Sequence, residues 1–171
     1  YSNQTVCRNI KYRPSEYRAM NTCDLVDQYA DEVQVAETIG LKHFGQHQRF
    51  SGKIQTLKCF EDNSLLKKIV GAPNTATILV VDGGGSMRCA MVGDLIAALA
   101  VEHGWHGIIV NGCIRDSCAL QHIPIGIMAL GTNPKKSSKL DHGEIGLALA
   151  FAGTRFESGD FLYADEDGIV V

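Results

Sequence analysis

Two apolar runs separated by one alanine-rich segment constrain the fold of this chain more than any other feature of its sequence. The runs cover residues 78–82 and 106–114, and glycines flank both. Continuous apolar runs of this kind predict buried strands of a parallel sheet. The intervening residues 94–103 are rich in alanine and leucine and favour a helix that ends at Gly104. The order strand, helix, strand predicts a βαβ unit, whose crossover is almost always right-handed.

Polar residues stand at two turns of this unit. Gly93-Asp94 begins the predicted helix, and Arg115-Asp116 follows the second strand. In a βαβ unit both positions lie at the carboxyl edge of the sheet, which is where open α/β sheets bind ligands. These residues are well separated in sequence, but we expect them to surround one small volume.

The remainder of the chain predicts one α/β domain in which antiparallel strands extend the central βαβ unit. Residues 1–20 are polar and irregular and are expected to form an amino-terminal arm, so that the domain covers residues 21–171. A length of 171 residues suits a single domain with a substantial core. Other helices are predicted at residues 21–31, 64–70 and 118–121, and other strands at 33–36, 50–59, 125–130 and in hairpins over 146–171.

The composition argues against two classes of partner. With a net charge of −3, the chain offers no general electrostatic attraction for nucleic acid or for an anionic membrane. Lone charges or glycines interrupt every apolar run, so none is long enough to span a bilayer. Cys59, Cys89 and Cys113 lie in or beside apolar segments, which favours buried, reduced thiols and a cytoplasmic protein.

The predicted helix start at Gly93 is suited to a small carboxylate ligand. The first amides of a helix have no partner within it, and the helix dipole favours an anion there. The amides of Asp94, Leu95 and Ile96 would hold such a group, and Gly93 would let it approach the backbone closely. The alternative interpretation is that Asp94 only complements the helix dipole.

Arg115 and Asp116 add groups that suit an enolate-forming reaction. The guanidinium of Arg115 is a charged fork for a carboxylate or a developing oxyanion, and Asp116 is a hard oxygen ligand for a divalent metal. Together with the helix start, they suit carbon–carbon cleavage of a 2-keto acid, with a water held by the metal or by Asp94 as the candidate base. The alternative is a surface ion pair worth about 0–1 kcal/mol.

Two other features carry weaker indications. The glycine-rich turn at residues 82–86 follows a strand but lacks a nucleotide-binding pattern, which favours a tight turn instead. Near it, Arg88 is expected to contact either a ligand or a neighbouring carboxylate. The six histidines show no paired metal-ligand spacing and are expected to be surface or capping residues.

The residues singled out above also form a recognisable pattern. The chain carries the signature D-x20-R-D, in which twenty residues separate Asp94 from Arg115-Asp116. Short motifs at residues 56–63, 80–86, 107–112 and 158–165 belong to the same pattern. In these positions the chain resembles the family of the regulator of ribonuclease E activity A (RraA) and its relatives, the class II 4-hydroxy-4-methyl-2-oxoglutarate aldolases. The resemblance covers roughly residues 21–171. It implies a single swivelling β/β/α-type domain that assembles into a trimer or a hexamer.

By this resemblance, a small 2-keto acid of the pyruvate and oxaloacetate class would bind Gly93, Asp94, Leu95, Ile96 and Arg115. Asp94 and Arg115 would take part in catalysis, and Asp116 would hold Mg²⁺ or Mn²⁺. The implied reactions are cleavage of 4-hydroxy-4-methyl-2-oxoglutarate into two pyruvates and decarboxylation of oxaloacetate.

The same resemblance implies a second function, because the family divides. A non-catalytic member would bind and inhibit ribonuclease E or a related RNA-processing enzyme, through protein contacts and without direct binding to nucleic acid. The regulators lack the complete charged signature, so its presence here favours an enzyme. Residues 56–63 and 161–165 nevertheless closely resemble the regulator branch.

Overall fold

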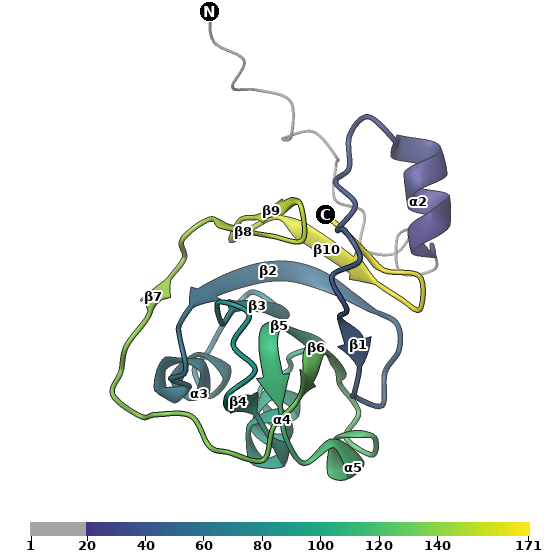
Figure 1. Ribbon diagram of the computed structural model, residues 1–171. Coiled ribbons are helices and arrows are strands. Elements are labelled where there is room, and N and C mark those ends of the chain that lie inside the picture. Colours follow the sequence, from purple (N-terminus) through teal and green to yellow (C-terminus); the bar gives the residue numbers. More distant parts are fainter. Residues whose placement is uncertain (1–19) are drawn as a thin grey trace, which may run out of the picture.

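A curled mixed sheet lies at the centre of the structure, a computed structural model that describes residues 20–171 (Figure 1). The strands follow the order β1-β6-β5-β3-β2-β10-β11, with β4 paired to β5 and β7 paired to β2. This arrangement confirms the predicted α/β class with additional antiparallel strands. The predicted arm over residues 1–20 lies outside the described residues, apart from Met20. The strands are β1 Lys42–His43, β2 Phe50–Lys58, β3 Ile78–Asp82, β4 Ala90–Val92, β5 Gly107–Ile114, β6 Gly126–Thr132, β7 Glu144–Ile145, β8 Leu149–Phe151, β9 Thr154–Phe156, β10 Phe161–Ala164 and β11 Ile169–Val170.

The two apolar runs of the sequence form adjacent parallel strands, as predicted. β3 pairs with β2 on one side and with β5 on the other, and β6 continues the parallel order beyond β5. Val80 and Ile109 stand opposite each other in this register, and both are completely buried. Such burial on both faces explains why these strands are continuously apolar in sequence.

Successive side chains of the parallel strands point into two different cores. On one face, Leu79 and Ile108 pack with the helices α3 (Ser64–Val70) and α4 (Asp94–Glu102). On the other face, Val80 and Ile109 pack with residues of β8 to β11. Figure 1 shows α3, α4 and the short α5 (Ser117–Leu120) on one side of the sheet and β8 to β10 on the other. Within residues 20–171, no helix combines the length and apolar character needed to cross a bilayer.

The carboxyl-terminal residues form the predicted hairpins. β8 and β9 pair across a turn at Ala152 and Gly153, both of which have positive φ angles. β10 and β11 form a second antiparallel pair, and β10 also pairs with β2. The hairpin of β10 and β11 thereby becomes one edge of the main sheet.

One predicted strand needs correction, and the short strands β1, β4 and β7 were not predicted. Residues 33–36 form no strand: Val35 makes an isolated bridge to Val170, beside hydrogen bonds from Ala36 N to Ile169 O and from Gln34 N to Val171 O. Conversely, β4 lies between β3 and α4 and was not predicted, because three residues are too few to show a periodic pattern. Gly93-Asp94 therefore follows β4 directly, and the crossover begins from a short extra strand.

A buried carboxylate joins the first described helix to the last hairpin. Helix α2 (Thr22–Tyr29) has Asn21 as its N-cap, whose side chain accepts a hydrogen bond from Asp24 N. Asp165, only 3% exposed, accepts hydrogen bonds from the backbone nitrogen and the hydroxyl of Thr22, each at 2.7 Å. Burial raises the pKa of Asp165, but the hydrogen bonds from Thr22 and Asp167 outweigh this and lower the pKa overall. The side chain is therefore ionised at neutral pH, and its charge is satisfied internally.

The two hydrogen bonds between Thr22 and Asp165 form a clasp, and this Thr22–Asp165 clasp predicts that the stability of the fold depends on pH. Because the pKa of Asp165 is lower in the folded chain than in the unfolded one, its stabilising effect is complete above the ordinary aspartate pKa and is lost as pH falls through the folded value. The free energy of unfolding should therefore decrease as the pH is lowered below about 4. Asp165→Asn should reduce the free energy of unfolding at neutral pH by about 1–3 kcal/mol and make the acid decline shallower.

Denaturant unfolding across a pH series measures both effects. The exposed Asp31→Asn is the matched control and should behave as wild type. Asp62 is buried and also has a lowered pKa, because hydrogen bonds from Ser64 and Leu140 exceed the opposing effect of burial. It contributes to the decline that remains in Asp165→Asn, together with Glu61 and Asp141, whose pKa values are also lowered. An unchanged acid profile in Asp165→Asn would contradict this account.

Candidate functional site

The predicted site residues meet at Gly93. This residue is the N-cap of α4 and directly follows β4. A Cβ atom at Gly93 would lie 2.6 Å from Oδ2 of Asp116 and 3.3 Å from Nε of Arg115. The backbone of Gly93 is extended, with φ −134° and ψ −171°, and any residue could adopt it. Glycine is needed here because the side chains of Arg115 and Asp116 occupy the space that another side chain would fill.

Asp116 turns its carboxylate back toward the start of α4. Its backbone is left-handed, with φ 56° and ψ 35°, a conformation that aspartate tolerates better than most residues. Oδ2 accepts a hydrogen bond from Asp94 N at 3.3 Å and lies 3.6 Å from Nε of Arg115. The predicted convergence of the helix start with Arg115 and Asp116 is therefore present in the structure.

The start of α4 binds carboxylates, but in this structure they belong to the chain itself. The amide of Asp94 donates to Asp116, and the amide of Leu95 donates to Oδ1 of Asp94 at 2.7 Å. Two of the three amides predicted to hold a ligand are thus engaged, whereas the amide of Ile96 bonds to neither acid. A ligand carboxylate would have to replace Asp94 or Asp116 at these amides.

The site is open to solvent at the edge of the sheet. The side chains of Arg115 and Asp116 are 31% and 37% exposed. The side chain of Leu95 is 79% exposed, and that of Ile96 packs into the helix-side core. Leu95 and Ile96 can therefore contribute to the site only through their backbone amides.

Residues that position β4 were not predicted to belong to the site. Asn63 donates through its side-chain amide to Met91 O at 2.9 Å, and Lys139 donates to Oδ1 of Asn63 at 2.8 Å. Arg115 N in turn donates to Val92 O at 2.9 Å. Asn63 stands at the N-cap of α3 without a side-chain cap hydrogen bond. No sequence pattern could indicate that its amide instead reaches a distant strand.

The glycine-rich turn at residues 82–86 has the structural role that was predicted. Gly84 and Gly85 have φ angles of 67° and 70°, in the left-handed region that favours glycine. Asn111 holds the turn: its carbonyl accepts from Gly83 and Gly85, and its side-chain amide donates to Asp82 at 3.0 Å.

Arg88 contacts a neighbouring carboxylate, one of the two outcomes expected for it. Its Nε lies 2.6 Å from Glu61, which also accepts from the Ser86 hydroxyl at 2.6 Å. Hydrogen bonds from Arg88 and Ser86 lower the pKa of Glu61. The pair joins the segments that follow β2 and β3.

The three buried thiols of the described chain are not activated nucleophiles. The five cysteines within residues 20–171 are free, and Cys59, Cys89 and Cys113 are buried, as predicted. Burial raises the pKa of Cys59 to about 12 and also raises the pKa of Cys89 and of Cys113. These thiols are therefore protonated at neutral pH.

Sequence comparison places this geometry among known proteins. A family model described as RraA-like, Aldolase/RraA, matches residues 21–171. The chain belongs to the RraA-like family. A relative from Laribacter hongkongensis is 53% identical over 149 residues, which cover 87% of this chain and 93% of the relative. A relative from Pseudomonas syringae pv. tomato is 46% identical over 88% of this chain and 92% of its own length. Both carry the provisional name 4-hydroxy-4-methyl-2-oxoglutarate aldolase.

Solved structures of RraA-like proteins agree with the fold but differ in name. A protein from Geobacillus kaustophilus, titled S-adenosylmethionine: 2-dimethylmenaquinone methyltransferase, superposes with a TM-score of 0.86 at 46% identity, covering 88% of this chain and 93% of its own. The RNA-processing inhibitor RraA from Thermus thermophilus superposes with a TM-score of 0.84 at 41% identity, covering 88% and 91%. One fold therefore carries names from an enzyme class and from a regulatory class.

The carboxylate of Asp116 is the group suited to hold the divalent metal that the resemblance to class II aldolases implies. Within residues 20–171, no three His, Cys, Asp or Glu side chains are grouped as a metal site. In the same part of the chain, Oδ1 of Asp116 has no hydrogen-bond partner, whereas Oδ2 is engaged. One available carboxylate oxygen fits Mg²⁺ or Mn²⁺, because Mg²⁺ often binds through one or two carboxylates and completes its shell with water and substrate.

The close contacts at Gly93 predict that alanine substitutions at Gly93 and Gly104 have opposite effects. The first should disturb the site and the second should lower the stability. Gly93→Ala should leave the free energy of unfolding within about 1 kcal/mol of wild type, because its backbone is permitted for alanine, but should displace Asp116 from the start of α4. Gly104 has φ 80° and open space around it, so Gly104→Ala should cost about 1 kcal/mol through backbone strain and leave the site unchanged.

Crystal structures and denaturant unfolding of the two variants provide the measurement. If Asp116 keeps its contact with Asp94 N in Gly93→Ala, the steric role assigned to this glycine is wrong.

Proposed function

We propose that this RraA-like chain is a metal-dependent lyase acting on 2-keto acids. Its reactions are cleavage of 4-hydroxy-4-methyl-2-oxoglutarate into two pyruvates and decarboxylation of oxaloacetate. The observation that supports this most directly is the meeting of Asp94, Arg115 and Asp116 around Gly93, at the carboxyl edge of a parallel sheet. The provisional aldolase name of close relatives supports the same class of reaction.

Each residue of the site has a separate task in this proposal. The substrate carboxylate binds the amides at the start of α4, where it replaces the carboxylates of Asp94 and Asp116. Arg115 donates hydrogen bonds to the keto oxygen and stabilises the negative charge that develops there. Asp116, released from Asp94 N, holds Mg²⁺ or Mn²⁺ through its oxygens. When bound, the metal supplies Lewis-acid polarisation of the substrate's keto group.

Both reactions share one intermediate and differ in the bond that breaks. In aldol cleavage, a water held by Asp94 removes the proton of the 4-hydroxyl group. The bond between carbons 3 and 4 then breaks, its electron pair forms the pyruvate enolate, and the other fragment leaves as pyruvate. In decarboxylation, carbon dioxide leaves and the same enolate forms. Protonation of the enolate carbon gives pyruvate in either case.

The role of Asp116 predicts the behaviour of a matched pair of variants. Asp116→Asn should abolish metal-dependent pyruvate release with the fold retained, because an amide is a poor ligand for a hard cation. Asp141→Asn is the control: Asp141 is also an aspartate with a left-handed backbone (φ 57°), but it is exposed and pairs with Lys68. This control should retain wild-type turnover.

The assay supplies oxaloacetate with Mg²⁺ or Mn²⁺, against EDTA, and detects pyruvate with lactate dehydrogenase. Decarboxylation by the metal alone is subtracted as background. Turnover in Asp116→Asn equal to that of Asp141→Asn would refute the assigned site, and absence of turnover above background in wild type, with both substrates, would refute the lyase.

A second candidate function is inhibition of an RNA-processing enzyme through protein–protein binding. The observation that favours it is the likeness to the Thermus thermophilus protein named as an RNA-processing inhibitor. In this case the chain should bind a purified ribonuclease E-like protein with saturation, and neither EDTA nor Asp116→Asn should weaken the complex. Biosensor titration measures this, and failure to bind while turnover is present would exclude the regulatory role.

We also propose that the chain assembles as a homotrimer or a hexamer of two trimers. Large apolar side chains remain exposed in the monomer near the ends of β2 and β7, among them Phe60 at 58%, Leu140 at 64% and Ile145 at 52%. Such side chains are commonly covered at interfaces. Analytical ultracentrifugation measures the assembly, and a monomer at micromolar concentration would contradict it.

A further inference from the structure

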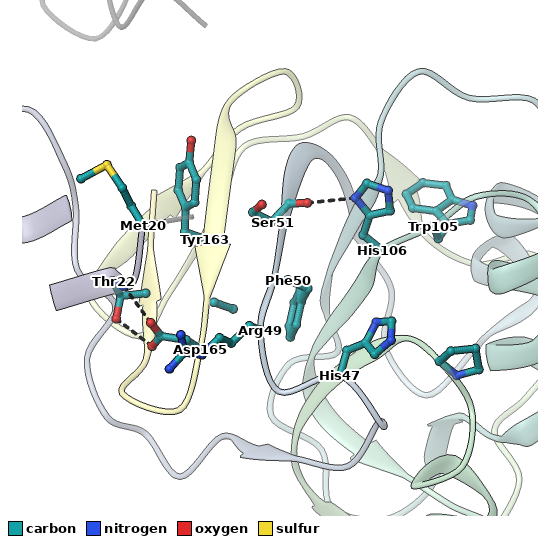
Figure 2. Close-up of a pocket in the computed structure, with 12 residues that line it drawn as sticks. Met20, Thr22, His47, Arg49, Phe50, Ser51, Trp105, His106, Tyr163 and Asp165 are labelled. Carbon is teal, nitrogen blue, oxygen red and sulfur yellow. Dashed lines mark hydrogen bonds between the residues drawn. The ribbon is translucent and has the colours of Figure 1, made fainter. Parts of the chain in front are cut away.

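A cavity of about 280 Å³ lies at the edge of the sheet opposite to the candidate site (Figure 2). It is found where the parallel strands begin: Phe50 is the first residue of β2, His106 directly precedes β5, and Pro124 precedes β6. Arg115 and Asp116, by contrast, follow the carboxyl end of β5. None of the residues proposed above for catalysis lines this cavity.

An aromatic ring with a fixed position contributes the apolar surface of the cavity. Phe50 lies against Gly107 and Gly126, where a Cβ atom would come within 2.3 Å and 2.0 Å of the ring. His43 packs edge-on against the same ring at 6.3 Å between centroids. Trp105, which also lines the cavity, is held by a hydrogen bond from its indole nitrogen to Val70 O at 3.1 Å. The apolar surface is therefore preformed but small, because Phe50 and Trp105 are only 7% and 4% exposed.

The carboxylate that lines the cavity is not available to a ligand. Asp165 accepts hydrogen bonds from both donors of Thr22 and from Asp167 N at 3.0 Å. These contacts saturate a buried group that has a structural task in the clasp. A cationic ligand would thus find no carboxylate of Asp165 to pair with.

Polar side chains of His47, Arg49, Ser51, His106 and Tyr163 also line the cavity, and of these we consider the guanidinium of Arg49 and the imidazole of His106. Arg49 uses Nε to contact Glu166 at 3.0 Å, and within residues 20–171 its two terminal nitrogens bond to no other side chain. Nδ1 of His106 lies 3.0 Å from Ser51 O. Because a backbone carbonyl only accepts, Nδ1 carries the proton, and Nε2 of the neutral ring is left as an acceptor. Figure 2 shows Arg49 and His106 on opposite sides of Phe50.

We propose that this cavity binds a small aromatic carboxylate that carries a hydroxyl group. The ring of the ligand packs on Phe50, its carboxylate accepts from the terminal nitrogens of Arg49, and its hydroxyl donates to Nε2 of His106. A cavity of about 280 Å³ limits the ligand to roughly one ring. This site is separate from the proposed lyase site and does not depend on that function.

Calorimetric titration of the full-length protein with 4-hydroxybenzoate tests the proposal. Wild type should bind this probe more tightly than benzoate, which lacks the hydroxyl, and more tightly than cyclohexanecarboxylate, which lacks the aromatic ring. Arg49→Gln should weaken binding of 4-hydroxybenzoate by about tenfold, because a charge-assisted contact is lost. Arg155→Gln is the control, since Arg155 is a similarly exposed arginine whose Nε also pairs with a glutamate, Glu157.

A second variant tests the hydroxyl contact independently of charge. His106→Leu should bind 4-hydroxybenzoate and benzoate with equal affinity, while circular dichroism checks that the fold is retained. Asp116→Asn should bind the probe as wild type does, which separates this site from the outcome of the lyase assay.

Three results would overturn the proposal. The first is no heat of binding for 4-hydroxybenzoate with wild type. The second is an equal loss in Arg49→Gln and Arg155→Gln, which would indicate general charge attraction. The third is loss of binding in Asp116→Asn but not in Arg49→Gln, which would place the probe at the carboxyl edge.

Discussion

The hydrogen bond from Arg115 N to Val92 O is the contact on which the candidate site depends. It joins the residue after β5 to the last residue of β4, so that two turns far apart in the chain lie side by side. Beyond this contact, Gly93 must have no side chain, because Arg115 and Asp116 fill the adjacent space. The site is thus fixed by backbone pairing first and by the small size of one residue second. The charged side chains of Arg115 and Asp116 then need few further contacts to hold their positions.

The sequence predicted the parts of this arrangement that rest on local pattern. The buried runs of β3 and β5 and the alanine-rich α4 are long enough to be read from their composition, and their order requires a shared sheet edge. β4 could not be predicted, because its three residues are placed by Asn63 and by the end of β5 rather than by their own preferences. The left-handed backbone of Asp116 was equally hidden, since aspartate is compatible with many turn conformations.

The contacts of the helix start show a further limit of sequence analysis. Free helix amides, a carboxylate ligand and neighbouring acids were all predicted, but not that the acids would bind the amides themselves. Which partner a donor finds depends on side-chain reach of a few tenths of an ångström, and sequence carries no such information. The same applies to Arg88. A ligand or a neighbouring carboxylate was expected as its partner, and in the structure the partner is the carboxylate of Glu61. Residue types were predictable here, whereas pairings were not.

The joining of Thr22 to Asp165 spans 143 positions of the chain. On the ribosome, α2 leaves the exit tunnel long before its partner has been synthesised, so it cannot reach its final place until residue 165 has emerged. Closing so large a loop is entropically costly and is rewarded only once the last hairpin exists. Docking of this helix therefore requires the last hairpin, and a chain truncated before residue 165 would leave α2 without its anchor.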